Sequence, residues 1–548
     1  MSFRHSILAA VLAIASGTAG WAYAQAQPAE QPQPTAEIHA VRVSGVGHHP
    51  TAGIDPARMQ TIADQALLEL GGVPPAQLGF GQMEEIARRI NVAYREAGFL
   101  VATAFLPEQS IGEDRVLHVQ VIEGTIGRVL VQGSERYRDD QLNASSLGLL
   151  GRPLRQRELE RAIMHAEDLP GVSVRSVLRA GEHPGETDII LVAEDSARPY
   201  EVHAALSNHG TDSTGRYRAE AGITAFNALG AGDTLAATVG YGLNPADSWY
   251  ASAALSIPSS RVTGLSGTLG FSRSSLELNT GPFAALDIHG PATIAHFGAN
   301  WTFARSPTLT ARTTARWIHE ESRLDGLGIE LSRHKFDVLE AGLSLQHTHH
   351  RSRGINVLQA SLRKSVNDES PEVNWLHPAH TSHFLIGRLA LARLQALPGN
   401  QRLLLRGNAQ FTSDALAPLE QFSLGGPDSV RAFPLSSALD DRGVQATLEY
   451  QVNAPGFAHH TSPFDGRSWA DLVTVSLFYD WGRTSPASSN RQLGIQPVTL
   501  EGAGIGLGLR LPWQPDLRLD VSAATPTGST KPFDGDDLQV WARIGMTF

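Results

Sequence analysis

The chain has 548 residues, too many for one ordinary domain, and it has no cysteine, so disulfides and thiolate metal sites are excluded. It carries 44 Lys and Arg residues against 55 Asp and Glu residues, and this mildly acidic balance argues against a nucleic-acid-binding protein. Glycine is frequent, with 53 residues, as expected of a β-rich protein with many turns.

Residues 1–24 have the features of a secretory signal peptide. Arg4 and His5 precede the apolar run Ile7–Ala15, and Ala22-Tyr-Ala24 has the small-x-small form of a cleavage site. An N-terminal membrane anchor is the alternative, but the apolar run is short for a span. No later run of about 18 apolar residues follows, and only helices and closed barrels satisfy their backbone in lipid. The rest of the chain is therefore expected to be soluble or a barrel.

A polar, Pro-rich linker at 25–36 precedes two mixed units, at 37–124 and 125–196. Each unit is expected to fold in the order β-α-α-β-β, and two tandem copies of one architecture favour an array over a catalytic domain. The elements expected in the first unit are a strand at Ile38–Val43, a helix capped by Asp55 that ends before Gly71, a helix at 83–97, and strands at Leu100–Leu106 and Arg115–Ile122. Those expected in the second unit are a strand at Ile126–Val131, helices at Arg138–Leu149 and Leu154–Glu167, and strands at Val172–Leu178 and Thr187–Ala193.

Residues 197–548 are expected to form a transmembrane antiparallel β-barrel of about 16 strands. Segments of roughly 9–14 residues alternate there with turn signals. A large soluble β-sandwich is the alternative, but sandwiches rarely sustain strands of this length with one lipid-like face each. The expected strands are 199–208, 216–226, 232–243, 247–257, 262–273, 293–305, 308–320, 334–348, 354–365, 381–396, 400–412, 442–453, 470–482, 500–511, 516–525 and 538–548.

The connections between these strands alternate in length. Most that follow even-numbered strands are short and most that follow odd-numbered strands are longer, as is typical of periplasmic turns and outer loops. The short ones include 306–307, 397–400 and 512–515, and the longer ones 274–292, 366–380, 413–441 and 483–499. One even connection, 454–469, is longer than this rule predicts, and its sequence does not explain why.

The strictest alternation lies in the stretch Leu472–Gly482. Successive side chains of a strand point to opposite faces, so this strand suits a wall between lipid and water. Asp480 is expected on the polar face, as an acid buried toward the lumen. The apolar face carries Val473, Val475, Leu477, Tyr479 and Trp481, and the other face Thr474, Ser476, Phe478, Asp480 and Gly482. The final strand alternates in the same way up to Phe548.

The loop at 413–441 contains the sequence Gly425-Gly-Pro-Asp-Ser-Val-Arg-Ala-Phe-Pro434, which has strong turn chemistry. It presents Arg431, whose guanidinium cannot lose its proton in practice and therefore needs water or an anion. If the loop folds into the lumen, Asp480 is an available partner and the pair could be bidentate. If it does not, Arg431 is a solvated loop residue, and sequence spacing alone leaves the two possibilities open.

The chain resembles the two-partner secretion transporters, the TpsB proteins of the ShlB/FhaC/HecB haemolysin secretion/activation type, over nearly everything after the signal. The β-α-α-β-β units resemble their polypeptide-transport-associated (POTRA) domains, and three turns match: Tyr94–Phe99, Val121–Gly124 and Asp168–Gly171. Ser429-Val-Arg-Ala-Phe433 resembles the Val-Arg-Gly-(Tyr/Phe) loop motif of the family, and Phe478-Tyr-Asp-Trp-Gly482 its Phe-x-Asp-x-Gly strand motif. Together and in this order, the motifs are specific.

The resemblance implies a conformational lock in which the arginine loop folds into the barrel. The residues it assigns to that lock are Arg431, Asp480, Phe478, Gly482, Val430 and Phe433. Two features depart from the family. Ala432 stands where the family has glycine, so that the loop differs locally or fills a position with φ > 0 at some cost. The linker at 25–36 is too short and too Pro-rich for the N-terminal plug helix of the family, so no plug is expected.

The resemblance also implies the function: export of one large TpsA-type exoprotein from the periplasm through the outer membrane of a Gram-negative bacterium, by type V secretion. The POTRA-like units would capture the unfolded substrate by β-augmentation at an exposed strand edge. The candidate residues, beside helix 83–97, are Tyr94, Leu100, Ala102, Ala104 and Leu106. Other expected partners are outer-membrane lipid and the barrel-assembly machinery that inserts the chain; nucleic acid is not expected.

Two other functions are weighed against export: a barrel-assembly factor of the wider superfamily, and a passive porin. Having two POTRA-like units rather than more argues against the first, and the tandem periplasmic units argue against the second. No nucleophile elbow, phosphate loop or zincin motif is present, so neither an enzyme nor a cofactor is expected. The histidines at 347, 349, 350, 377, 380 and 383 flank turns or strand ends, and we expect no metal there.

Overall fold

The computed structural model describes residues 35–548 except 212, 245–247, 279–285, 371–380, 382, 465 and 514. The chain forms two compact units, one extending to Ala97 and including Ala102–Ile122, the other comprising Gly98–Val101 and Glu123–Phe548. The expected signal peptide, the absence of a plug helix and most of the linker fall outside the described residues. Over the described part of the chain, no helix is both long and apolar enough to cross a membrane.

The first unit contains two small sheets and two helices. β2, β5 and β4 form one sheet in that order, and β1 pairs with β3 in the other. The single strand expected at Ile38–Val43 is wrong, because β1 and β2 break at His39 and join different sheets; β1 also takes in two residues assigned to the linker. The elements are β1 (Thr35–Ile38), β2 (Ala40–Ser44), η1 (Pro50–Ala52), α1 (Pro56–Gly71), β3 (Ala76–Gly79), α2 (Phe80–Glu96), β4 (Thr103–Phe105) and β5 (Val116–Ile122).

The two helices of this unit form where the sequence predicts them. The Asp55 carboxylate accepts a hydrogen bond from the N–H of Arg58 at 2.9 Å, and Pro56 occupies the first turn of α1, so the helix is capped as expected. One face of each helix is buried in the core of the unit: Met59, Ala63, Ala66 and Leu67 of α1, and Met83, Ile86, Ala87, Ile90 and Tyr94 of α2.

Side-chain amides from the helices occupy both edges of the three-stranded sheet. Gln60 of α1 accepts from the N–H of Val43 at 3.1 Å and donates to the carbonyl of Val41 at 2.7 Å, along the edge of β2. Asn91 of α2 accepts from the N–H of Ala104 at 2.7 Å and donates to its carbonyl at 2.8 Å, along the edge of β4. A side-chain amide thus takes the place of a neighbouring strand at the middle of each edge.

The second unit begins with an α+β part whose sheet has the order β6-β8-β7, with β6 parallel and β7 antiparallel to β8. The helix expected at Arg138–Leu149 is wrong: the Ser- and Gly-containing stretch after Asn143, which favours turns over helix, leaves only a short α-helix and a separate 3-10 turn. The elements are β6 (Thr125–Gln132), α3 (Asp139–Leu142), η2 (Leu147–Leu149), α4 (Gln156–Glu167), β7 (Val172–Ala180) and β8 (Glu186–Asp195).

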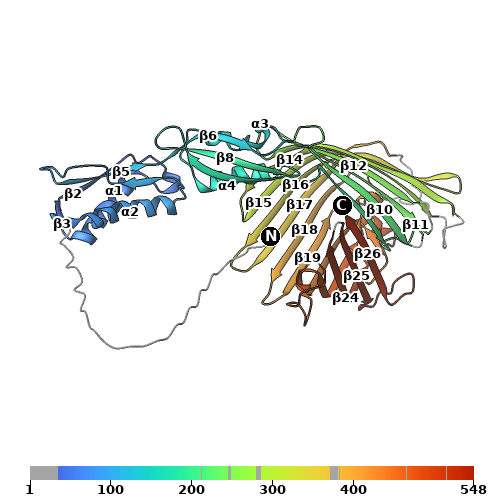
Figure 1. The fold of residues 1–548 in the computed structure, drawn as a ribbon. Helices are drawn as coiled ribbons and strands as arrows, with labels where there is room; N and C mark the ends of the chain where they lie inside the picture. The colour runs from blue at the N-terminus through green and yellow to red at the C-terminus, as the bar shows by residue number, and fades with distance from the viewer. Residues whose placement is uncertain are drawn as a thin grey trace, which may run out of the picture. The chain divides into compact units, whose positions relative to one another are not determined.

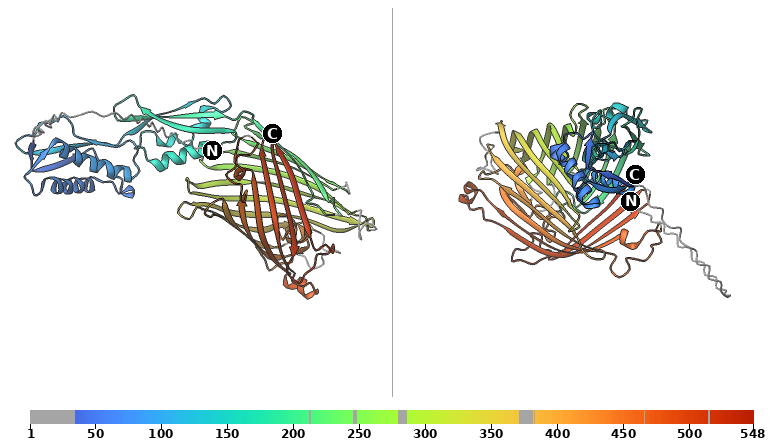
Figure 2. Two further views of the ribbon diagram at one scale, coloured as in Figure 1. Left: turned by 60° about the horizontal axis from the view of Figure 1, so that its bottom comes forward. Right: turned by 90° about the vertical axis from the view of Figure 1, so that its left-hand side faces the viewer.

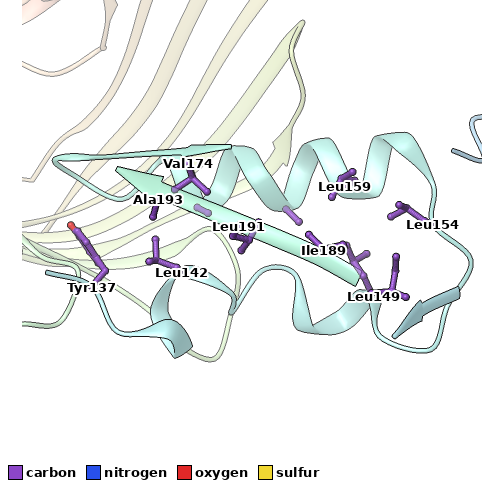
Figure 3. Packing of buried hydrophobic residues seen from close by; sticks show 12 residues of the cluster. Tyr137, Leu142, Leu149, Leu154, Leu159, Val174, Ile189, Leu191 and Ala193 are labelled. Carbon is purple, nitrogen blue, oxygen red and sulfur yellow. The ribbon is translucent and has the colours of Figure 1, made fainter. Parts of the chain in front are cut away.

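A compact apolar core holds this α+β part together (Figure 3). Leu159 of α4 and Val174 of β7 pack in one cluster with Leu191 of β8, Leu142 and Leu149. Asp188 of β8 is also buried, and the hydrogen bonds and charge of Arg128, 2.9 Å away, hold the pKa of that carboxyl below its usual range.

The rest of the second unit is a closed antiparallel barrel of sixteen strands, as predicted. The strands follow one another round the wall in chain order, from green through yellow to red, and the ladder closes between β26 and β9 (Figures 1 and 2). They are β9 (Tyr200–Ser207), β10 (Tyr217–Phe226), β11 (Thr234–Leu243), β12 (Trp249–Pro258), β13 (Leu265–Leu278), β14 (Ile288–Arg305), β15 (Leu309–Gly326), β16 (Ile329–His349), β17 (Gly354–Asp368), β18 (Leu385–Ala396), β19 (Gln401–Phe411), β22 (Arg442–Asn453), β23 (Val473–Ser485), β24 (Thr499–Pro512), β25 (Asp516–Pro526) and β26 (Gln539–Thr547).

The connection between β15 and β16 is shorter than expected. β15 and β16 continue through the segment expected to be a loop and meet at Leu327-Gly328, where φ values of 53° and 77° suit a two-residue hairpin turn.

The long connection between β22 and β23 contains η5 (Trp469–Asp471) and an aromatic cluster. The ring of Trp469 lies 5.8 Å from that of Phe457 and 5.9 Å from that of Phe464, between centroids. The extra length of this connection is therefore used to bury aromatic surface.

The α+β part of the second unit contacts one end of the barrel. Asp168 accepts two hydrogen bonds from the guanidinium of Arg305, at 2.8 and 3.1 Å, and the side-chain amide of Asn227 donates to the carbonyl of Arg136 at 2.6 Å. Arg305 and Asn227 lie next to connections that follow even-numbered strands. These contacts therefore assign the even connections to the same side of the membrane as the α+β part, and the loop between β19 and β22 opens at the other end.

Candidate functional site: a loop folded into the barrel

The segment between β19 and β22 has its own secondary structure. It contains η4 (Pro418–Glu420) and a small ribbon in which β20 (Phe422–Leu424) pairs with β21 (Ala438–Asp440). At the tip, Gly425 and Gly426 both have φ of 100°, and a Cβ on Gly425 would lie 2.2 Å from the carbonyl oxygen of Pro434. Glycine is therefore required at the first of these positions both by conformation and by space.

The tip of this loop is buried against the inner face of the barrel. Phe478 of β23 is buried in the cluster that holds the tip, whereas its neighbours Leu477 and Tyr479, which point the other way, are 57% and 42% exposed. Because side chains alternate across a strand, the loop must lie on the lumen side of the wall. The buried cluster consists of Leu424, Val430, Ala432, Phe433 and Ala438 from the loop and Phe478, Leu500 and Ala524 from the wall.

Arg431 and Asp480 meet at the centre of this contact. The guanidinium donates from Nε to Oδ2 at 2.8 Å and from Nη2 to Oδ1 at 3.0 Å, and the backbone N–H of Arg431 donates to Oδ2 at 3.1 Å. Asp480 is fully buried and Arg431 is 7% exposed. The pair is bidentate and largely desolvated, the geometry in which an arginine–carboxylate contact is most specific.

Three further groups of the wall complete the surroundings of Arg431. Glu449 of β22 accepts a hydrogen bond from Nη1 of Arg431 at 2.9 Å. The centroid of the Phe478 ring lies 3.2 Å from the guanidinium carbon of Arg431. Trp541 of β26 donates its indole N–H to the carbonyl of Arg431 at 2.7 Å. The loop is thus tied to β22, β23 and β26, which all lie on one side of the closure between β26 and β9.

The arginine of the loop has two acidic partners on the wall. One guanidinium faces two carboxylates, those of Asp480 and Glu449, and Thr447 donates its hydroxyl to Asp480 at 2.9 Å. If the loop withdrew, Asp480 would lose its cationic partner, whereas Glu449 would keep the hydrogen bond from Gln451 at 2.9 Å and the nearby charge of Arg406. Such a site contributes little net stability but strongly favours one conformation, because breaking the pair leaves a buried charge without a partner.

Glycines in the wall make room for the loop. A Cβ on Gly482 would lie 2.7 Å from a methyl group of Leu424, and a Cβ on Gly502 would lie 2.3 Å from the Cβ of Ala432. Ala432 is fully buried and is not among the described non-glycine residues with positive φ. Of the two alternatives at Ala432, a position with φ > 0 is therefore excluded, and its methyl group occupies the space left by the missing side chain of Gly502.

The sequence did not single out Thr447, Glu449 or Trp541. Thr447 and Glu449 lie on the buried face of β22, at alternate positions with exposed Leu448 between them, so the alternation of β22 was a usable signal. For Trp541, the sequence indicates only the face of the final strand. Its contact with Arg431 depends on which strands become neighbours when the barrel closes.

The residues proposed for substrate capture in the first unit do not form one surface. Tyr94 is completely buried, and Ala104, itself buried, has its backbone N–H and carbonyl bound to Asn91. Leu100, Ala102 and Leu106 lie outside β4, and the N–H of Leu100 donates instead to the carbonyl of Leu154. The strand expected at Leu100–Leu106 is reduced to three residues, and the residues just before it, Gly98–Val101, belong to the second unit.

The histidines do not assemble into a metal site within the described residues, where no group of three or more potential ligands is found. His347 and His349 lie edge to face, with ring centroids 5.9 Å apart, near the end of β16. His377 and His380 lie outside the described residues.

A sixteen-stranded barrel with an α+β part at one end and an arginine loop in its lumen defines an outer-membrane transporter of proteins with periplasmic POTRA domains. The model of the haemolysin secretion/activation protein ShlB/FhaC/HecB family matches residues 185–511, and that of the ShlB-type POTRA domain matches residues 49–124. The chain belongs to the ShlB/FhaC/HecB family, and it is a two-partner secretion translocator of the outer membrane whose N-terminal units lie in the periplasm.

Relatives and solved structures agree with this assignment over most of the chain. The chain is 26% identical to the hemolysin transporter protein ShlB of Serratia marcescens, over 91% of this chain and 86% of the relative. It is 24% identical to the heme/hemopexin transporter protein HuxB of Haemophilus influenzae, over 90% and 86%. The structure of CdiB from Escherichia coli superposes with a TM-score of 0.71 at 18% identity, covering 95% of this chain and 92% of that one, a likeness of fold.

The contact between Ala432 and Gly502 generates a test. Gly502→Ala should displace the loop, because overpacking at such a contact costs about 1–3 kcal/mol, and it should raise the conductance of the purified protein in planar bilayers. The double variant Gly502→Ala/Ala432→Gly, which moves the methyl group to the other side of the contact, should restore the original conductance. Gly545→Ala, where a Cβ would meet nothing closer than 3.8 Å, is the matched control. Equal conductance in Gly502→Ala and Gly545→Ala would contradict this packing argument.

Proposed function

We propose that this translocator exports one dedicated large exoprotein, and that its loop at 412–441 holds the closed state until the substrate arrives. The observation that carries this proposal is the buried bidentate contact of Arg431 with Asp480, which fixes a loop inside the lumen that a substrate must cross. A pore that served only small solutes would gain nothing from a single conformation held by desolvated charge.

The exported partner is proposed from the relatives. ShlB is named a hemolysin transporter and HuxB a heme/hemopexin transporter, so a secreted protein of the TpsA type is the substrate class that fits this chain. Outer-membrane lipid around the barrel and the barrel-assembly machinery that inserts it are further proposed partners. Because no phosphate loop is present, folding of the substrate outside the cell is the proposed source of directional bias.

A barrel-assembly function is not favoured. The structure of BamA from Haemophilus ducreyi superposes with a TM-score of 0.54 at 16% identity, which is a likeness of fold alone. The family model matches the secretion transporters over 185–511, and so the dedicated export function takes precedence.

The structure supports a different capture surface from the one first expected. β7 is one of the two edge strands of the β6-β8-β7 sheet, and within the described residues no hydrogen bond joins its outer edge to another element. Val177 and Leu178 near its end are 48% and 37% exposed. We propose that an extended segment of the unfolded substrate adds to β7 as a further strand, since backbone hydrogen bonds supply affinity with little dependence on sequence.

The exported partner is tested by comparing the culture medium and cell-surface proteins of strains with and without this chain, by mass spectrometry. We expect one large protein to disappear while the other outer-membrane barrels keep their abundance. A broad loss of barrels with no single missing exoprotein would instead support the assembly-factor function.

The role of Arg431 is tested by Arg431→Ala. Removing one partner of a buried pair costs about 3–5 kcal/mol, so the closed state should be lost; secretion should fall and the conductance should rise, while the barrel still assembles. Arg491→Ala, an exposed arginine of α5 (Ser488–Gln492) in another connection, is the control and should leave both unchanged. Secretion at the parent level in Arg431→Ala would refute the assigned role.

Capture at β7 is tested by placing proline in turn at Arg175, Ser176, Val177 and Leu178. Alternate N–H groups of an edge strand point toward β8 and outward, so the effects should alternate along the strand. Proline at the outward positions should stop export with the α+β part still folded, as judged by protease resistance, whereas proline at the others should unfold it. Normal export from every folded variant would exclude β7 as the capture surface.

A further inference from the structure

Arg431 is not the only charged residue of its loop that is buried. Glu420, at the end of η4, is only 1% exposed. A carboxylate is rarely buried to this extent unless it is paired. Its surroundings therefore bear on what holds the loop in place.

Two arginines of the wall bind the carboxylate of Glu420. Arg363 of β17 donates to Oε1 from Nη2 at 2.5 Å and from Nε at 3.2 Å, and Arg388 of β18 donates to Oε2 at 2.7 Å. The backbone carbonyl of Glu420 accepts from the side-chain amide of Gln410 at 2.7 Å. Both carboxylate oxygens and the carbonyl are thus bound by side chains of the wall.

The wall keeps a partner for Arg363 even without the loop. Arg363 also donates to Glu320 of β15 at 2.6 Å and to Glu340 of β16 at 2.8 Å. If Glu420 left, Arg363 would remain paired with two acids, and Arg388 would keep its hydrogen bond to Gln410 at 2.7 Å. The contact of Glu420 with these arginines can therefore break without leaving a buried guanidinium unpaired, and this allows the contact to be reversible.

The neighbouring residues show that this contact holds a different part of the loop from Arg431. Leu416 and Ala417 are buried in a cluster with Ile318, Val338 and Ile386, whereas the tip packs against β23 and its neighbours. The start of the loop is thus fixed to β15–β18, and its tip to β22–β26. At the start of the loop an acid, Glu420, binds arginines of the wall. At the tip an arginine, Arg431, binds acids of the wall.

We propose that two electrostatic contacts, or latches, hold the loop: Arg431 with Asp480, and Glu420 with Arg363 and Arg388. The Glu420 latch holds the first half of the loop against β15–β18 independently of Arg431, and the lumen opens only when both latches release. This proposal rests on the proposed function in taking the loop as the element that closes the pore. Glu420 is a positioning residue, since it acts by placing the loop.

The chain has no cysteine, so single cysteines can report on each half of the loop separately. Ala417→Cys and Ser429→Cys place a thiol at positions that are 0% and 9% exposed in the closed loop, one beside each latch. The rate at which a water-soluble maleimide labels each thiol in the full-length protein in vesicles measures local release. Heat-modifiable migration on gels verifies that each barrel is folded.

Glu420→Gln should raise the labelling rate of Ala417→Cys about tenfold or more, because a hydrogen bond to a charged group is worth at least one tenfold step. It should leave the rate of Ser429→Cys within about twofold, as expected of sites that do not share partners. Arg388→Gln, which leaves the loop sequence intact, should act in the same direction as Glu420→Gln. Arg431→Ala should raise the labelling rate of Ser429→Cys and leave that of Ala417→Cys within about twofold. The double variant Glu420→Gln/Arg431→Ala should give the largest conductance.

Glu340→Gln is the matched control, because it removes a carboxylate from the same arginine on the wall side only. Unchanged labelling of Ala417→Cys in Glu420→Gln would overturn the second latch, as would an equal increase in Glu340→Gln. If Arg431→Ala secretes normally while Glu420→Gln still exposes Ala417→Cys, the proposed role of Arg431 fails and the second latch stands.

Discussion

Closure of the sixteen-stranded ladder is the constraint on which the rest of the second unit depends. Lipid offers no hydrogen-bond partners, so the sheet must have no open edge, and its inner face is then shielded from lipid. Charged groups can be buried on that face only if other charges meet them there. The loop between β19 and β22 meets this condition, because it brings Arg431 to the acids of the wall and Glu420 to the arginines.

The two contacts of the loop differ in what they leave behind. Withdrawal of Arg431 would leave Asp480 without its cationic partner, whereas withdrawal of Glu420 would leave Arg363 still bound to Glu320 and Glu340. The loop is held closed by these two sets of ion pairs together with the apolar clusters beside them. Such an element suits a transporter that must close its lumen and still let an unfolded chain pass.

The strand edges of the first unit differ from those in the α+β part of the second unit. In the first unit, Gln60 and Asn91 occupy the edges of the three-stranded sheet with side-chain amides, and this protects exposed backbone from unwanted pairing. In the second unit, β7 ends in exposed apolar residues beyond the core, and its outer edge has no such cover among the described residues. Capture of an extended chain therefore belongs more naturally to the second unit than to the first.

The sequence by itself determined the sixteen strands, their faces and the capped helix after Asp55, because alternation and capping depend on residues close together in the chain. It also placed Asp480 on the lumen side and made Arg431 a candidate partner. Only the tertiary structure decided that Trp541 and Glu449 complete that site, that Gly502 accommodates Ala432, and that Arg363 binds Glu420. These contacts join residues far apart in the chain, and no local pattern specifies which strands a loop will meet once the barrel has closed.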